Sequence, residues 1–363
     1  MSAGLYIHIP FCKSICYYCD FFRGVYDEKR AGEYPAALER DAREFSQEGI
    51  RFFDSVYIGG GTPTVLPKDA LKAALTGIKR YFVIQEGAEF SCEGNPESFT
   101  REKALELKSL GVNRISLGVQ SLSDKSLKAL GRIHSASEAL SAVRLAVSEG
   151  MRVSADIMLG VPFQGEEDVK EFVARMREAG AEHLSAYMLT LCPGTPLWQA
   201  EKRGEFILDD DRLADLYEVF HAAAREAGYE RYEVSNWALD GAESRHNLKY
   251  WRGEEYVGLG AGAYSMVKGR RFYTEKDVDK YLSGKIVRVT EEVMTQKELG
   301  KERVVFGLRT RFGAPEEALN GAGIDVKKLM ERAGRFFELR GGALHLKEEF
   351  FLVADGIVAK YII

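Results

Sequence analysis

The sequence predicts an α/β protein: a partial (β/α)6 barrel of the TIM type, followed by a small C-terminal helical, winged-helix-like domain. Two observations lead to this fold class. Short apolar runs alternate with amphipathic helical stretches six times from the N-terminus, which is typical of repeated βα units. The length of 363 residues suffices for one large domain and one smaller domain.

The six expected strands are rich in Val, Ile, Leu, Tyr and Phe, and most are too continuously apolar to have one wet face. Such runs are typical of parallel strands that helices cover on the outside. We expect the strands at residues 5–9, 55–59, 89–93, 114–119, 152–159 and 183–189. Six units in order favour a barrel over a Rossmann sheet, so functional residues are expected at the carboxyl ends of the strands.

Amphipathic stretches between these strands predict the helices that cover them. The stretches span residues 33–46, 68–81, 101–110, 137–149 and 166–179. Gly111, Gly150 and Gly180 follow three of them, and a glycine at that position commonly ends a helix.

The pattern changes after residue 191. The expected elements are a long helix at 209–227, a strand near 231–234, a polar and aromatic stretch at 244–251 and a glycine-rich segment at 258–262. Helices at 291–308, 315–320 and 326–335 then precede a hairpin around 341–342 and a final apolar run. Three helices plus a hairpin predict the winged-helix-like module, so the two domains are placed at 1–285 and 290–363. Basic and acidic residues balance over 291–363, which argues against DNA binding.

Charge and hydropathy exclude several classes of function. The 50 Lys and Arg against 55 Asp and Glu give a net charge of −5, so no basic excess points to nucleic acid. No run of about 18 apolar residues predicts an integral membrane segment, and the first ten residues carry no basic, apolar leader. The cysteines lack the even, dense spacing of a secreted scaffold. We therefore expect a cytoplasmic protein in a reduced compartment.

Three of the five cysteines, Cys12, Cys16 and Cys19, follow the first expected strand in the spacing C-x3-C-x2-C. Three thiolates on one short loop can each ligate one iron of a 4Fe–4S cluster, which leaves the fourth iron open to a small-molecule ligand. Zinc is the alternative, but a structural zinc site usually takes four ligands in two pairs, and only His8 stands nearby. The isolated Cys92 and Cys192 are expected to be buried small apolar residues.

With Tyr18 directly before the third cysteine, this spacing resembles the signature of the radical S-adenosylmethionine (SAM) superfamily. The resemblance implies a radical SAM core with a 4Fe–4S cluster on three cysteines, whose open iron is chelated by the amino and carboxylate groups of SAM. It also implies that an electron from the cluster can cleave SAM into methionine and a deoxyadenosyl radical.

The same resemblance assigns SAM binding to residues near successive strand ends. These residues are Tyr6, Tyr18, Gly59, Gly60, Gly61, Thr62, Glu93, Gln120, Arg132 and Asp156. The glycines would bind the SAM amino group, the carboxylates can accept hydrogen bonds from ammonium or ribose, and Arg132 can pair with a carboxylate. Taken singly, each of these polar groups is more typical of a surface or structural position, and three glycines fit an ordinary turn equally well.

Within the superfamily, the segments at 6–12 and 306–309 resemble the HemN/HemW family of oxygen-independent coproporphyrinogen III oxidase-like proteins. Two departures from the HemN-type oxidases favour the HemW type. HemW proteins are known in this family as haem chaperones. Phe21 stands where the oxidases carry a fourth cysteine, and eleven residues precede Cys12 where the oxidases carry a longer extension.

The resemblance implies haem or a porphyrin, haem-accepting proteins and an electron donor as partners, and it allows a homodimer. It leaves open whether the chain is an enzyme. The alternative to the chaperone is an oxygen-independent coproporphyrinogen III oxidase or another porphyrin-modifying or methyl-transferring radical SAM enzyme.

Residues 246–251 resemble the H-N-x-x-Y-W haem-binding motif of HemW. Imidazole ligates haem iron and flat rings pack on a macrocycle, so His246, Tyr250 and Trp251 are the haem-binding candidates. The alternative is a polar and aromatic loop that packs on the barrel edge. One departure is Tyr264, where relatives often carry His.

Overall fold

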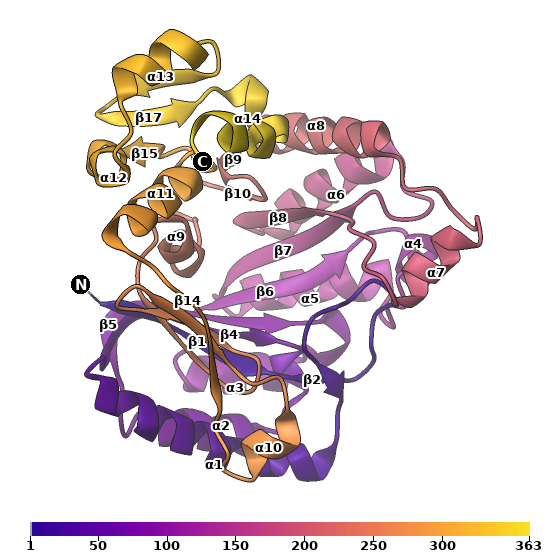
Figure 1. Cartoon of the computed structure of the whole chain (residues 1–363). Helices are drawn as coiled ribbons and strands as arrows, with labels where there is room; N and C mark the ends of the chain where they lie inside the picture. Colours follow the sequence, from indigo (N-terminus) through magenta and orange to yellow (C-terminus); the bar gives the residue numbers. More distant parts are fainter. Residues whose placement is uncertain (1) are drawn as a thin grey trace.

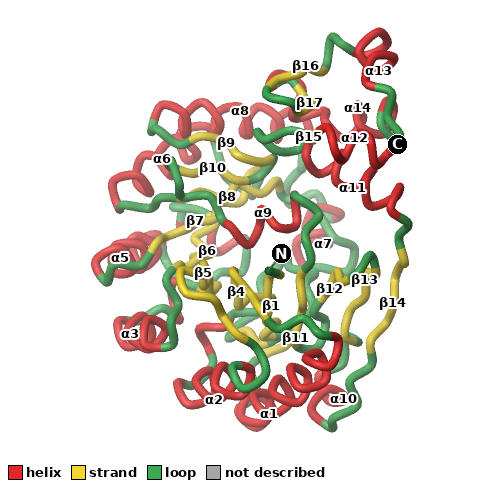
Figure 2. Tube along the Cα trace, turned by 90° about the vertical axis from the view of Figure 1, so that its left-hand side faces the viewer, coloured by secondary structure: helices red, strands yellow, loops and turns green. Residues whose placement is uncertain are grey.

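The structure is a computed structural model that describes residues 2–363, and one open sheet of twelve strands organises most of it (Figure 1). The strands follow the order β14-β13-β12-β11-β1-β4-β5-β6-β7-β8-β10-β9. The seven neighbours from β11 to β8 run parallel to one another. They curve into an arc with helices on its outer side (Figure 2). This arc is the partial barrel that the sequence predicts.

All six predicted parallel strands form, each overlapping its expected position. They are β1 (Ala3–Ile9), β4 (Phe52–Gly60), β5 (Val83–Gly94), β6 (Arg114–Gln120), β7 (Arg152–Leu159) and β8 (His183–Met188). Nearly every residue of β1 and β6 is buried, as expected of strands that lie between covering helices and the barrel interior.

The five predicted covering helices and the long helix predicted at 209–227 also form, and local signals fix their ends. They are α1 (Glu28–Phe45), α2 (Lys68–Ile78), α3 (Arg101–Ser109), α5 (Ala136–Ser148), α6 (Glu166–Ala179) and α8 (Asp210–Glu226). Ser135 and Glu138 form a reciprocal capping box at the start of α5. Gly180 ends α6 with a φ of 88°, a conformation that glycine adopts without steric cost. Within residues 2–363, no helix has both the length and the apolar character needed to cross a membrane.

Strands that the sequence did not predict extend the sheet at both ends. β11 (Tyr256–Leu259) lies parallel to β1, and β12 (Tyr264–Val267), β13 (Arg270–Thr274) and β14 (Arg288–Val293) follow it antiparallel. At the other edge, the predicted strand near 231–234 forms as β9 (Glu230–Glu233) and pairs with β10 (Asn236–Ala238). The helix predicted from residue 291 is wrong at its start, because β14 extends to Val293 and the capping box at Thr295 starts α11 (Gln296–Gly307).

The C-terminal segment has a hydrophobic core of its own, formed by buried residues between 304 and 362. Its elements are α11, β15 (Ala314–Pro315), α12 (Glu316–Ala322), α13 (Val326–Ala333) and the hairpin of β16 (Phe337–Arg340) and β17 (Ala343–Leu346). This order agrees with the predicted winged-helix-like module. The final apolar run is helical: a 3-10 segment (Glu348–Val353) leads into α14 (Ala354–Tyr361). We propose the domains 1–285 and 290–363, with β14 pairing back into the large sheet.

Short elements fill the connections. They are β2 (Phe11–Cys12), β3 (Gly24–Val25), α4 (Asp124–Ala129), α7 (Pro196–Lys202), α9 (Arg245–Trp251) and α10 (Val278–Leu282), with 3-10 segments at Ser46–Glu48, Pro63–Val65 and Pro96–Ser98. The polar and aromatic stretch at 244–251 is therefore a helix and not a loop. Ser244 caps it, because its Oγ accepts a hydrogen bond from Asn247 N (3.3 Å).

Asp41 of α1 ties the first helix to elements near the other end of the sheet. Its side chain is fully buried and accepts hydrogen bonds from Gly260 N (2.9 Å), Tyr281 Oη (2.8 Å) and Arg288 Nη2 (2.6 Å). A buried charge is tolerated when its partners satisfy it completely, and three donors surround this carboxylate. The contact therefore holds α10 and β14 against the N-terminal part of the barrel.

Replacing Asp41 by Asn is expected to lower the free energy of unfolding by about 3 kcal/mol, because the charge of Arg288 loses its buried partner. Urea denaturation followed by circular dichroism measures this change. Asp279→Asn is the matched control, since it breaks an exposed ion pair with Arg30 (2.8 Å) and should cost less than about 1 kcal/mol. Equal effects of the two variants would contradict the role given to Asp41.

Candidate functional site

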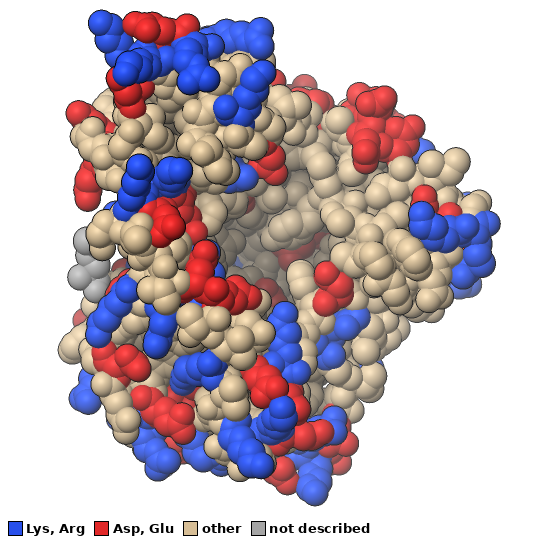
Figure 3. Space-filling model, viewed as in Figure 1, with Lys and Arg blue, Asp and Glu red and all other residues tan. Residues whose placement is uncertain are grey.

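A cavity of about 550 Å³ lies across the inner face of β4 to β8. The cysteine loop, defined as residues 12–23, and the start of α9 also contribute to its wall. The space-filling view shows a hollow over the central strands (Figure 3). Ordinary barrels fill this space with branched apolar side chains. Here Ser91, Ser116, Ser154 and Ser185, one from each of β5 to β8, line it instead.

The cysteine loop leads out of β1 and places all three motif cysteines on the cavity wall. Cys12 is buried, and Cys16 and Cys19 are half-buried. Arg132 Nη1 donates a hydrogen bond to Cys16 Sγ (3.3 Å). Burial raises the pKa of Cys12 to about 11 and also raises the pKa of Cys19. Without a bound metal these two thiols are protonated at neutral pH, so ligation must displace their protons.

The arrangement fits a cluster better than a single metal ion. Among residues 2–363, no three His, Cys, Asp or Glu side chains come together as ligands of one ion. In a 4Fe–4S cluster each thiolate binds a different iron, so three sulfurs need not converge on one point, and a bound cluster supplies electron transfer at this wall. His8, the additional candidate for zinc, contacts Tyr6 Oη (3.0 Å) and Phe22 O (2.9 Å).

The glycine stretch at the end of β4 packs directly on the strand that leads into the cysteine loop. Thr62 N donates a hydrogen bond to Phe11 O (2.8 Å). A Cβ at Gly61 would stand 2.7 Å from the same oxygen, and a Cβ at Gly60, whose φ is 112°, would stand 2.6 Å from the His8 ring. The packing of the chain itself therefore requires glycine at both positions. Gly60, Gly61 and Thr62 also line the cavity, although their backbone N–H groups are all hydrogen-bonded within the chain.

Glu93, near the end of β5, holds a carboxylate at the cavity wall. It accepts hydrogen bonds from Tyr57 Oη (2.9 Å) and Gly60 N (3.0 Å), and a Cβ at Gly59 would stand 3.0 Å from it. Burial raises its pKa to about 7, because removal from water outweighs the two hydrogen bonds. Both partners of Glu93 are neutral, so the ammonium group of a bound ligand would give its carboxylate an ion pair.

A second carboxylate, that of Asp156, lies on β7 in the same cavity. It accepts hydrogen bonds from Ser116 Oγ (3.1 Å) and Ser154 Oγ (3.5 Å), and burial raises its pKa to about 6. Two carboxylates in one cavity with raised pKa values indicate a binding site more than a stabilising contact.

Gln120 and Arg132 form another part of the wall. Gln120 has a φ of 66° and a buried Oε1 with no hydrogen-bond partner among the described residues. Arg132 Nη2 donates hydrogen bonds to Gly118 O (2.6 Å) and Asn95 Oδ1 (2.7 Å). A left-handed backbone at a residue with a side chain and an unsatisfied acceptor are features that cluster at ligand sites.

The two tyrosines assigned by resemblance lie in different places. Tyr18 lines the cavity, whereas Tyr6 is not among its lining residues. Tyr6 directs its hydroxyl to His8 Nδ1 (3.0 Å) and places its ring 6.3 Å from that of Tyr57. Tyr6 therefore supports the tyrosine that holds Glu93.

The haem-binding candidates lie on α9, and none of the three lines the cavity. His246 is buried, with Ser55 Oγ 3.0 Å from its Nδ1 and Tyr250 Oη 2.8 Å from its Nε2. Burial lowers its pKa to about 3, so the imidazole is neutral and both ring nitrogens are engaged. Trp251 packs edge-on against Phe306 of α11, with 5.9 Å between ring centroids. From the same motif, Asn247 reaches the cavity.

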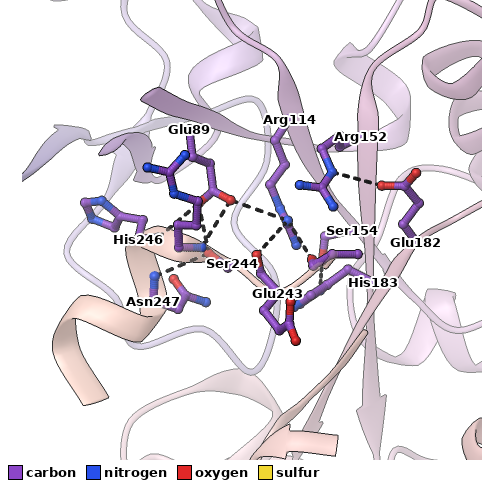
Figure 4. Close-up of polar contacts among 12 residues, drawn as sticks. Glu89, Arg114, Arg152, Ser154, Glu182, His183, Glu243, Ser244, His246 and Asn247 are labelled. Carbon is purple, nitrogen blue, oxygen red and sulfur yellow. Dashed lines mark hydrogen bonds and ion pairs between the residues drawn. The ribbon is translucent and has the colours of Figure 1, made fainter. Parts of the chain in front are cut away.

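The cavity wall also contains polar residues that no sequence motif marks. They are Ser91, Arg114, Ser116, Ser154, His183, Ser185, Tyr187 and Ser244, several of them drawn in Figure 4. A signal for some of them exists in the sequence: polar residues recur at every second position within apolar strands, as with Ser154 and Asp156 or His183 and Ser185. That period places them on one face of the sheet.

The isolated cysteines, His134 and Tyr264 take no part in the groups described above. Cys92 is buried, as predicted, but the prediction for Cys192 is wrong: it is half-exposed and lines the cavity, because the chain after β8 returns to the cysteine loop. His134 is a buried structural residue whose ring nitrogens contact Val119 O and Glu97. Tyr264 Oη donates a hydrogen bond to Glu291 Oε1 (3.0 Å), outside the cavity.

An open βα sheet with three cysteines after its first strand and a polar cavity across the strands is the architecture of a radical SAM protein. The family model described as "Radical SAM superfamily" matches residues 6–176. A solved structure of coproporphyrinogen III oxidase (HemN) from Escherichia coli, described as a radical SAM enzyme, matches 99% of this chain and 90% of its own with a TM-score of 0.85. Its sequence identity of 18% makes this a likeness of fold.

Similar curated proteins show to which family of radical SAM proteins the chain belongs. A protein named heme chaperone HemW from Mycobacterium tuberculosis (strain ATCC 25618 / H37Rv) is 34% identical over 98% of this chain and 93% of its own. HemW from Bacillus subtilis (strain 168) is 34% identical over 91% and 86%, and HemW from Escherichia coli (strain K12) is 38% identical over 73% and 70%. The chain therefore belongs to the HemW family of radical SAM proteins.

Because the pKa of Glu93 is raised, the free energy of unfolding should depend on pH in a way that tests the role of this residue. Between its ordinary pKa of 4.5 and about 7, the folded state binds more protons than the unfolded state, so stability falls as pH rises. Glu93→Gln has no proton to lose there. In protein free of cofactors, this variant is expected to raise the free energy of unfolding at pH 8 by about 2 kcal/mol and to change it little at pH 4.

Urea denaturation at both pH values measures the effect. Glu97→Gln is the control of opposite sign, because the neighbouring His134 lowers the pKa of Glu97 despite its burial and the carboxylate stabilises the fold above its ordinary pKa. A loss of stability in both variants at pH 8 would show that Glu93 has a structural role only.

Proposed function

We propose that the chain is a haem chaperone of the HemW type, which binds haem together with a SAM-ligated 4Fe–4S cluster and delivers the haem to target proteins. One observation carries the proposal: at 34% identity the chain matches 93% of a protein named heme chaperone HemW. Haem-accepting proteins and an electron donor are the partners that such a role needs.

The cavity supports the cluster and SAM part of the proposal. Cys12, Cys16 and Cys19 are the cluster ligands, and the remaining SAM candidates on the wall supply complementary groups. Glu93 offers a carboxylate to the ammonium, Asp156 offers acceptors to ribose hydroxyls, and a guanidinium for a carboxylate comes from Arg132. Each of these side chains lines the same cavity as the cysteines.

Anaerobic reconstitution with iron and sulfide should give about four iron and four sulfide per chain. Cys16→Ala should lose most of this iron, because a three-cysteine site has no spare thiolate. Cys192→Ser is the matched control, since Cys192 lines the same cavity but lies outside the motif, and it should keep a full cluster. Stoichiometric zinc in place of iron would contradict the cluster.

Haem binding at His246 would require a change in the contacts of α9. Both nitrogens of His246 are within hydrogen-bond distance of hydroxyl groups, Ser55 Oγ at Nδ1 and Tyr250 Oη at Nε2. Ligation of haem iron by Nε2 therefore requires that the Tyr250 hydroxyl release it. Trp251 packs on Phe306 of α11, so a macrocycle bound at His246 would contact Trp251 only after a rearrangement of α9.

Titration with haem, monitored at the Soret band, tests whether His246 is the iron ligand. It uses two variants that are expected to change haem affinity in opposite directions. His246→Ala is expected to weaken binding at least tenfold, since it removes the iron ligand. Tyr250→Phe is expected to strengthen binding about fivefold, because it removes a competing hydrogen bond of about 1 kcal/mol while keeping the ring. Haem binding that neither variant changes would show that His246 is not the ligand.

The enzyme alternative is distinguished by a second readout. If haem does not bind, and the anaerobic protein with SAM converts coproporphyrinogen, the chain is an oxygen-independent coproporphyrinogen III oxidase and the chaperone proposal is wrong.

A further inference from the structure

The cavity extends well beyond the part next to the cysteine loop. Gln120 and Arg114 stand at the two ends of β6, and both line it. The strand spans seven residues, so the Cα atoms at its two ends lie about 20 Å apart. Arg114 therefore marks the inner end of the cavity, level with Ser91 and two residues deeper along the strands than Glu93.

The protein supplies hydrogen-bond partners for only some of the guanidinium donors of Arg114. Its Nη1 donates a hydrogen bond to Ala242 O (2.9 Å) and lies 3.5 Å from Glu89 Oε2. Glu89 is shared, since it also accepts hydrogen bonds from the backbone N–H groups of Arg245 (3.1 Å) and His246 (3.0 Å) at the start of α9. Figure 4 shows Arg114 between Glu89 and the pair of Ser154 and His183.

Two buried donors face the inner end without a partner. Arg114 Nη2 and Ser91 Oγ have no hydrogen-bond partner among the described residues, although the two residues are only 3% and 1% exposed. They are direct neighbours across β5 and β6, because Ser91 pairs in register with Arg114. Two unsatisfied donors at the same level of adjacent strands, both on the wall of one cavity, indicate a ligand that accepts hydrogen bonds.

The charges of the cavity are divided along its length. Glu93 and Asp156, the acidic side chains of β5 and β7 that line the cavity, follow Ser91 and Ser154 by two residues toward the carboxyl ends of their strands. His183, beside Ser154, has its pKa held well below its usual range by burial and by the nearby arginines, so it adds no charge. Glu89 lies beside Arg114 but is not on the cavity wall, and its carboxylate is shared with the start of α9. The wall at the inner end therefore offers a guanidinium, a hydroxyl and the side chain of Asn247, which suit an anionic group.

We propose that Arg114 and Ser91, with Asn247 at the edge, form a subsite for a carboxylate of a second ligand that shares the cavity with SAM. One carboxylate oxygen would accept from Arg114 Nη2 and the other from Ser91 Oγ. If the ligand is haem or a porphyrin, the group is a propionate; this identity rests on the proposed function, whereas the carboxylate subsite does not.

Protoporphyrin IX and its dimethyl ester test the subsite, because the ester keeps the macrocycle and removes both carboxylates. Titration followed by porphyrin fluorescence should show that the wild-type chain binds the free acid at least tenfold more tightly than the ester. Arg114→Gln should abolish this preference and leave binding of the ester unchanged. Ser91→Ala should reduce the preference about threefold, and it keeps the Arg114–Glu89 pair, so it serves if Arg114→Gln fails to fold.

Equal binding of acid and ester by the wild-type chain overturns the subsite and leaves haem binding intact. If neither porphyrin binds, the proposed function fails, and the subsite is decided by crystals soaked in 4-bromobenzoate. The expected result is anomalous bromine density in the cavity with the carboxylate at Arg114, absent in Arg114→Gln. Wild-type crystals that hold only water at Arg114 Nη2 overturn the subsite.

Discussion

The close backbone contact between the glycine stretch and the strand into the cysteine loop is the constraint on which the site depends. Only a residue without a side chain fits at Gly61, 2.7 Å from Phe11 O at the Cβ position. This contact sets where the cysteine loop leaves the sheet. Because neighbouring parallel strands end at the same edge, it also sets which groups on β5, β6 and β7 the cysteines can face.

The sequence predicted the elements whose signals are local. Six apolar runs gave the parallel strands, amphipathic stretches gave the helices, and cysteine spacing located the loop that lines the cavity. The flanking strands were missed because their burial comes from distant partners: β11 pairs with β1 across most of the chain. Arg114 was missed for a related reason, since a single arginine at the start of a strand carries no motif and its contacts are with residues 89 and 242.

For the residues of the haem motif, tertiary packing and not sequence resemblance decides where each side chain points. The resemblance made His246, Tyr250 and Trp251 candidates for one ligand, yet helical periodicity points the residues of this motif in different directions. Asn247 lines the cavity, His246 turns toward β4, and Trp251 faces the C-terminal unit. Which side chain of such a motif meets a ligand depends on the neighbours of the helix, and these neighbours come from three separate parts of the chain.

The short helix α9 has a consequence for communication within the molecule. Its first backbone N–H groups bind Glu89, which also contacts Arg114 at the inner end of the cavity, and its last residue packs on α11. If a ligand moved α9, the contact between Trp251 and Phe306 would transmit the displacement to the C-terminal unit. By thermodynamic reciprocity, any protein that binds that unit in one position of α9 changes the affinity of the cavity by the same factor.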